Sequence, residues 1–176
     1  VVVPEVRQDD IRLRVAADAG LRPVVVGPTG GAPGLAAVEV DDEDAYARIG
    51  RYLAGLGHVR IALVAYPLDR LRTAACERGL QEATVDGTVA LEVVPTDGTV
   101  EGAAAATRRL LTQSRGPSAV VLATDVMALA ALDVARRSGL VVPWDVSVVA
   151  GVDSVLCRLA TPALTSLPSL ATDLPF

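Results

Sequence analysis

Acidic and hydroxyl side chains gather where the predicted strands of this chain end. Ligands of parallel α/β sheets bind at the carboxyl ends of the strands, so binding chemistry is expected at these positions. Their mixture of carboxylates, hydroxyls and arginines suits a small polar ligand rich in hydroxyl groups. Taken singly, most of them could equally cap a helix or lie in a solvated loop. The positions are Gly27, Asp41, Asp42, residues 66–72, Asp97, Thr124, Asp125 and Asp153.

Residues that could carry out catalysis do not form a recognisable set. His58 is the single histidine, and its place between a helix and a strand favours a structural role over that of a base. No serine occupies a Gly-x-Ser-x-Gly turn, and no Cys/His spacing suggests a zinc site. The loop at residues 27–34 (GPTGGAPG) matches neither a phosphate loop nor a dinucleotide-binding fingerprint. The sequence therefore predicts no enzyme, no metal site and no cofactor.

Composition bounds the class of protein. The 176 residues are 51% hydrophobic and 21% charged, which is enough for a packed core and excludes a disordered chain. The net charge of −5 offers no basic surface for a phosphate backbone, so this segment alone should not bind DNA. The two cysteines are expected to be reduced thiols of a cytosolic protein. We predict a cytoplasmic location, because the chain contains neither an apolar run of about 18 residues nor a signal peptide at its start.

Short apolar runs alternate with helical patterns along the chain, which predicts an α/β protein with one or two mainly parallel sheets. Strands are expected at residues 1–3, 23–26, 35–40, 59–65, 89–94, 118–123, 146–150 and 164–167. Helices are expected at residues 8–19, from Asp42 to about Leu56, and at 70–83, 101–112, about 126–137 and near 155–159.

The stretch from Pro117 to Asp153 reads as strand, helix and parallel strand. Asp125 is placed to cap the helix, and Gly139 follows its last turn as a stop signal. Between residues 126 and 135 the only charged residue is Asp133, so the helix is apolar nearly all round. Such a helix is buried on more than one side. A partner subunit is the favoured cover, with cover from the same chain as the alternative.

Three stretches, in this order, resemble the lactose-repressor/galactose-repressor family of bacterial transcription regulators. They are residues 53–69 (LAGLGHVRIALVAYPLD), 119–154 (AVVLATDVMALAALDVARRSGLVVPWDVSVVAGVDS) and 161–167 (TPALTSL). The resemblance implies an effector-binding core of two doubly wound parallel-sheet subdomains of periplasmic-binding-protein type, with the ligand in the cleft between them. Residues 1–40 and 168–176 would form the N-terminal subdomain, which is incomplete in this chain. Residues 41–167 would form the C-terminal subdomain.

The resemblance also implies a ligand-binding set, but several positions depart from the family pattern. Ala74 and Cys76 stand at its two arginine positions, and Arg72 falls on a small hydroxyl residue. Asp153 takes the role of a ligand-binding acid if the alignment shifts by one residue; without the shift Val152 stands there. Either a nearby arginine replaces the lost clamp, or the effector differs from ordinary sugars, or the site has decayed. The predicted set is Asp41, Arg70, Arg72, Cys76, Thr124, Asp125 and Asp153.

The implied partners are a small effector and a second copy of the chain. We expect a sugar or sugar derivative, with a purine-like compound as the second choice. Family members form dimers through the helix that follows the Thr124–Asp125 position. Operator DNA would be reached only through a helix-turn-helix that this chain lacks, and no membrane is expected. A solute-binding protein of a sugar transport system is the alternative. The predicted dimer contacts are Met127, Ala128, Ala131 and Leu132.

Overall fold

The computed structural model describes residues 1–4, 6–29, 34–67, 70–83 and 87–168. They form two parallel sheets, as the alternation of strands and helices predicted. The first sheet has the order β1-β2-β3, and the second has the order β5-β4-β6-β7-β8. The strands are β1 (Val2–Pro4), β2 (Val24–Val26), β3 (Ala36–Val38), β4 (Arg60–Ala65), β5 (Ala90–Pro95), β6 (Ala119–Leu122), β7 (Ser147–Ala150) and β8 (Thr165–Ser166).

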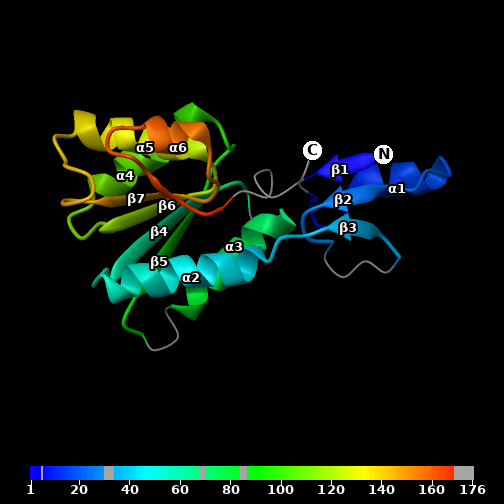
Figure 1. Ribbon diagram of the computed structural model, residues 1–176, viewed down its shortest axis with the longest axis horizontal. Helices are drawn as coiled ribbons and strands as arrows, with labels where there is room; N and C mark the ends of the chain where they lie inside the picture. The colour runs from blue at the N-terminus through cyan, green and yellow to red at the C-terminus, as the bar shows by residue number, and fades with distance from the viewer. Residues whose placement is uncertain (5, 30–33, 68–69, 84–86, 169–176) are drawn as a thin grey trace.

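Helices cover the second sheet on both faces, as Figure 1 shows. Helices α2 and α3 lie on one face, and α4, α5 and α6 lie on the other. We call β1–β3 with α1 the first lobe, and β4–β8 with the other helices the second lobe. The helices are α1 (Ile11–Asp18), α2 (Asp42–Gly55), α3 (Leu71–Glu82), α4 (Val100–Leu111), α5 (Asp125–Arg137) and α6 (Val155–Leu159). None of the helices among the described residues is long and apolar enough to cross a membrane.

The core of the second lobe is built on the neighbouring strands β4 and β6. Every side chain of β6 is fully buried, and alternate residues enter different apolar clusters. Val120 and Leu122 pack toward α4 and α5, whereas Ala119 and Val121 pack toward α2 and α3. A strand buried on both faces needs an unbroken apolar run, and that run is the signal by which the sequence predicted it. Cys76 and Cys157 form no disulfide and lie on opposite faces of the sheet, Cys76 among the residues near α2 and Cys157 among those near α5.

Helix α5 differs from expectation in its cap and in what covers it. The Thr124 hydroxyl, not the Asp125 carboxylate, accepts the hydrogen bond from the amide of Met127, so Thr124 is the N-cap. Met127, Ala128 and Ala131 have 0% exposure, because α4, α6 and the sheet pack around them. The structure therefore assigns these three predicted dimer contacts to the chain's own core. Leu132 is half-buried, and dimerisation through this helix stays a prediction.

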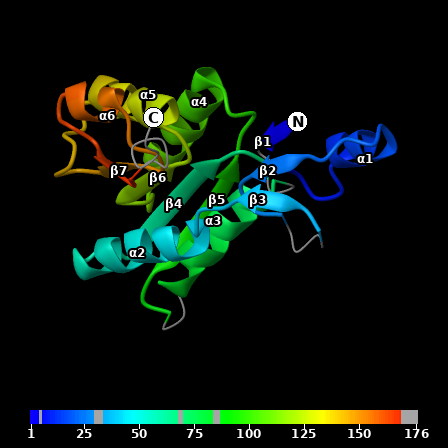
Figure 2. The ribbon, with the colours of Figure 1, turned by 45° about the vertical axis from the view of Figure 1, so that its right-hand side comes forward.

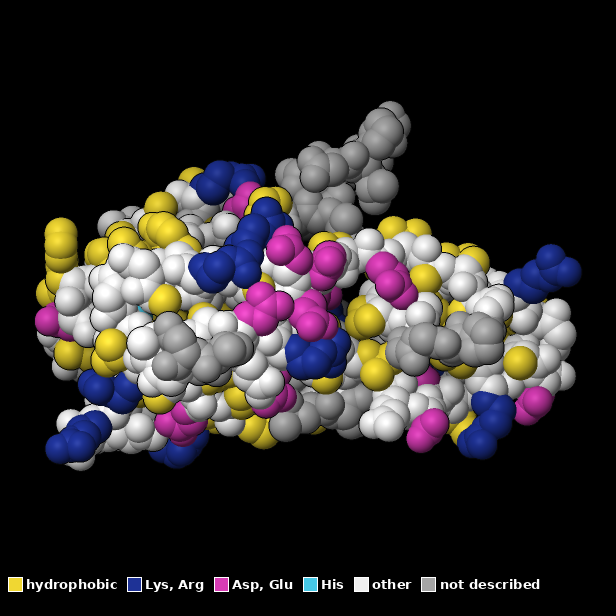
Figure 3. All heavy atoms as spheres, turned by 90° about the horizontal axis from the view of Figure 1, so that it is seen from below, with side chains coloured by type: hydrophobic (Ala, Val, Ile, Leu, Met, Phe, Trp, Pro, Cys, Tyr) yellow, Lys and Arg dark blue, Asp and Glu magenta, His cyan; other side chains and the backbone are white. Residues whose placement is uncertain are grey.

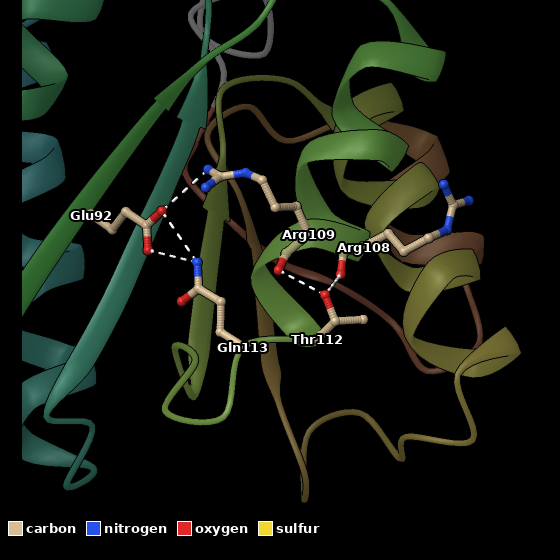
Figure 4. Close-up of polar contacts among 5 residues, drawn as sticks. All are labelled: Glu92, Arg108, Arg109, Thr112 and Gln113. Carbon is tan, nitrogen blue, oxygen red and sulfur yellow. Dashed lines mark hydrogen bonds and ion pairs between the residues drawn. The ribbon is translucent and has the colours of Figure 1, made fainter.

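Polar side chains fasten the edge strand β5 to the end of α4 (Figure 4). Arg109 donates to the Glu92 carboxylate at 3.2 Å, and the Gln113 amide donates to the same carboxylate at 3.3 Å. The Thr112 hydroxyl donates to the carbonyls of Arg108 and Arg109 in the last helical turn. A charged residue on an edge strand also discourages pairing with another chain.

His58 joins three strands at the amino end of the second sheet. One ring nitrogen lies 2.8 Å from the Ser118 hydroxyl, and the other lies 3.1 Å from the Ser147 hydroxyl. Burial lowers the pKa of His58, because the charged imidazolium loses hydration in this position. The predicted structural role is thus consistent with two hydroxyl contacts and a ring that prefers the neutral form.

We expect the free energy of unfolding to fall as the pH drops from 7.5 to 5.5. The unfolded chain takes up a proton on His58 near pH 6.5, whereas the folded chain, with its lowered pKa, takes it up only at lower pH. The pKa values of Asp10 and Asp97 are lowered and lie below this window. Urea unfolding at both pH values should show the dependence in the wild type and lose it in His58→Gln. Equal pH dependence in the two proteins would contradict the assignment.

Candidate functional site

A cavity of about 380 Å³ lies between the two lobes, at the carboxyl ends of strands from both sheets. It is reached by the ends of β1, β2 and β7, by the first turns of α2 and α3, and by the residues after β8. On the face drawn in Figure 3, acidic side chains gather near the middle of the molecule beside a basic group. The described residues of the wall are Pro4, Val26, Gly27, Val40, Asp41, Asp42, Asp44, Ala45, Arg48, Arg72, Gly151, Val152, Leu167 and Pro168.

The polar part of the wall is the start of α2. The Asp41 carboxylate caps the helix by accepting from the amide of Asp44 at 2.9 Å. The Asp44 carboxylate pairs with Arg48 at 3.2 Å, one turn further along. Carboxylates are favourable here because the first-turn amides carry partial positive charge. Of the three acids among the described residues of the wall, Asp41 and Asp44 therefore have partners within α2 itself.

Asp42 and Arg72 form the most constrained pair in the wall. The Asp42 side chain is only 6% exposed, and the Nε of Arg72 donates to both of its oxygens at 3.1 Å. A buried carboxylate is tolerated when a cation and hydrogen bonds compensate for its lost hydration. The Arg72 side chain is 33% exposed and belongs to the cavity wall. Asp42 thus fixes the orientation of a guanidinium beside the space where a ligand would lie.

Tyr46 is a buried residue of α2, one turn after Asp42. It is 1% exposed, and its hydroxyl abuts Gly151, since a Cβ built on that glycine would lie 2.0 Å from the oxygen. Burial raises the pKa of Tyr46 well above its usual value, and a hydrogen bond with Cys76 acts in the same direction. The phenol is therefore uncharged and packs in the core behind the cavity wall. Cys76 packs with it in the core and is not part of the cavity lining, contrary to the predicted ligand contact.

The structure separates the predicted ligand-binding residues. Asp41 and Arg72 line the cavity. Arg70 lies with its guanidinium 4.1 Å from the centre of the Tyr66 ring and outside the lining. Thr124 is occupied as the cap of α5. The role of Arg70 and Thr124 in binding stays a prediction that the geometry does not favour.

The two remaining predicted acids also lie outside the lining. The Asp125 carboxylate accepts from the amide of Val126 at 2.8 Å. The Asp153 carboxylate accepts from Arg158 and from the Ser166 hydroxyl. Val152 reaches the wall instead, as the alignment without a shift implied. The sequence placed Asp42 among the strand-end residues but not among the predicted ligand-binding residues, because only the fold reveals that its carboxylate is buried against Arg72.

The described lining suits the binding of a small molecule. Its apolar side includes Val26, Val40, Val152 and Leu167, and its polar side is the start of α2 with Arg72. Among the described residues that line the cavity there is no serine, cysteine, histidine or aromatic side chain. Within the described residues, no group of three or more His, Cys, Asp or Glu could hold a metal ion. The arrangement can hold a small molecule by hydrogen bonds along one edge and by apolar contact along its body.

A family model described as a periplasmic binding protein-like domain matches residues 51–174. The HTH-type transcriptional repressor PurR of Salmonella arizonae is 38% identical over 122 residues, which cover 67% of this chain and 36% of PurR. The chain thus spans about a third of the length of the curated relatives it matches.

Two solved structures are similar over nearly the whole chain. A LacI transcriptional regulator from a Rhodococcus species is 31% identical with a TM-score of 0.85, covering 98% of this chain and 64% of its own. The transcriptional regulator CelR in complex with cellobiose is 32% identical with a TM-score of 0.83, covering 94% of this chain and 52% of its own. The similarity therefore extends over both lobes.

Proposed function

Because the chain belongs to the periplasmic binding protein-like domain family, as an effector-binding core of the lactose-repressor/galactose-repressor type, we propose that its cavity binds a small polar effector. The observation that carries this proposal is the guanidinium of Arg72, which the buried Asp42 carboxylate holds in the wall of a cavity between two lobes. A preorganised guanidinium is a strong donor to hydroxyl or carboxylate oxygens.

The leading ligand class is a sugar or a sugar derivative. The polar side of the wall offers carboxylate acceptors and guanidinium donors, and both kinds of group bind hydroxyls. The solved CelR relative carries cellobiose. A purine is the second choice, since the curated relative is a repressor named PurR. A flat heteroaromatic ring gains most from an aromatic neighbour, and the lining residues that the structure describes include none, which favours a saturated ligand.

In this proposal the effector changes the balance between two arrangements of the lobes, and a DNA-binding head reads that change. The effect can be no larger than the difference in the effector's affinity for the two states. The full regulator would act in the cytoplasm as a homodimer that binds operator DNA through that head. A solute-binding protein of a sugar transport system is the second candidate, because it would use the same cleft without a DNA-binding head.

A thermal-shift screen against sugars, sugar phosphates, polyols and purines tests the proposal. A ligand at a hundredfold excess over its Kd should stabilise the native chain by about 2.7 kcal/mol. The shift should disappear in Arg72→Met and persist in Arg78→Met, which changes an exposed arginine on the same helix. A compound that stabilises wild type and Arg72→Met equally would place its site elsewhere. No shift with any compound would contradict a sugar, polyol or purine effector.

A further inference from the structure

The beginning of α3 depends on the other lobe for its cap. Arg70 is the N-cap residue, and its side chain makes no capping hydrogen bond. The first amides of an α-helix have no acceptor within the helix, so the amide of Leu71 must find one outside. It donates to the carbonyl of Val6, at 3.2 Å, in the segment that follows β1. The first turn of α3 is therefore completed by a carbonyl group from the first lobe.

Side-chain packing and a second backbone contact join the lobes at the same place. Leu71 is half-buried and packs with Val3, Val6 and Val25, which form the core of the first lobe. The backbones of Arg7 and Arg70 form an isolated antiparallel bridge beside it. In Figures 1 and 2 the first turn of α3 lies on the side of the second lobe that faces β1–β3. We call Val6, Arg7, Arg70 and Leu71 the clasp.

Each of the two segments that form the clasp is close in sequence to a residue that lines the cavity. Arg72 follows Leu71 directly, and Pro4, two residues before Val6, lines the cavity. Moving the lobes apart would take Leu71 out of its apolar pocket and remove the acceptor from its amide. The first turn of α3 would then lose the contact that holds it, and the backbone of Arg72 lies in that turn.

We propose that Leu71 is a positioning residue, whose insertion into the first lobe holds Arg72 in the cavity wall, so that lobe closure and the binding geometry of Arg72 form together. The role of Arg72 toward a ligand rests on the proposed function. The clasp itself does not, and it can be measured without any ligand. Leu71 does not line the cavity and acts only through its neighbour.

Hydrogen exchange of single amides, followed by NMR on the ligand-free chain, tests the clasp. In the wild type the Leu71 amide should be protected, although it stands in the first turn of a helix. Leu71→Ala should accelerate its exchange on the order of tenfold and leave the Leu80 amide, in the buried part of α3, unchanged. Leu71→Met should restore protection. Leu159→Ala, at a leucine that is 74% exposed, is the matched control and should change neither rate.

The Nε–H signals of two arginines on α3 provide a second readout. Arg72 donates to Asp42 in the first turn, and Arg78 donates to Glu43 at 2.9 Å further along. Leu71→Ala should accelerate exchange of the Arg72 Nε–H and leave that of Arg78 unchanged. A loss of protection at both arginines, or at Leu71 and Leu80 alike, would indicate general destabilisation and overturn the positioning role.

The clasp and the proposed function can fail separately. An unprotected Leu71 amide in the wild type, or a rate unchanged by Leu71→Ala, would overturn the clasp even in a chain that binds a sugar. A protected amide in a chain that no compound stabilises would overturn effector binding and leave the clasp in place.

Discussion

Gly79→Ala is expected to lower the free energy of unfolding by about 2–3 kcal/mol, the upper part of the range for overpacked cores. A Cβ on Gly79 would lie 2.1 Å from the carbonyl oxygen of Glu43 and 2.9 Å from the amide nitrogen of Ala47. Both atoms belong to the backbone of α2, so neither can turn away as a side-chain end could. The two helices must separate, and Asp42 and Arg72, which stand on these two helices, would separate with them. Urea unfolding of the wild type and the variant measures the loss.

Gly55→Ala is the matched control for this prediction. Gly55 is also helical, and a Cβ there would meet nothing within 4 Å. Alanine has the higher helix propensity, so this variant should be unchanged or more stable by up to about 1 kcal/mol. If Gly79→Ala were as stable as Gly55→Ala, the close contact between α2 and α3 would not exist in solution.

Arg72→Met is expected to weaken binding of any effector found in the screen by about 10- to 150-fold. Hydrogen bonds to charged groups contribute about 1.5–3 kcal/mol, and the substitution removes these donors while keeping much of the side-chain volume. Titration of the effector by calorimetry measures the change. An unchanged Kd would show that the guanidinium makes no contact with the ligand and would remove the basis for the proposed site.

The same substitution should also reduce stability, because the Asp42 carboxylate stays buried without this cation. The cost is about 1–2 kcal/mol, below that of a fully buried pair, since Arg72 is one-third exposed. Asp42→Asn combined with Arg72→Met should lose less than the sum of the single changes. The exposed pair Glu43 and Arg78, joined at 2.8 Å, is the control and should show a coupling below about 0.5 kcal/mol. Equal couplings would contradict the burial of Asp42.

The elements were predictable where a local physical signal marks them. The apolar runs at β4, β6 and β7 are buried on both faces, and their predicted ends differ from the observed ends by no more than one residue. Gly20, Gly57 and Gly139 follow their helices with positive φ, as stop signals should. Helix α1 begins at Ile11 instead of Gln8, because the Asp10 carboxylate accepts from the amide of Arg12 and caps the helix there.

The candidate site was less predictable, because it depends on where side chains point. Arg72 and Cys76 are four residues apart on α3, yet Arg72 lines the cavity and Cys76 lies one turn deeper against Tyr46. Adjacent residues differ as well, since Val152 reaches the wall and the Asp153 carboxylate turns to Arg158. Aligned motifs identify positions along the chain, but lobe packing and helix rotation decide which side chains meet a ligand.

The passage of the chain from the first sheet to the second is itself part of the cavity wall. Val40, Asp41 and Asp42 connect β3 to α2, and all three line the cavity. A molecule bound there would contact this connecting segment as well as the two lobes. It would limit torsion of the connecting backbone. Ligand binding would then reduce the motion of the two lobes relative to each other, even where their average positions stay the same.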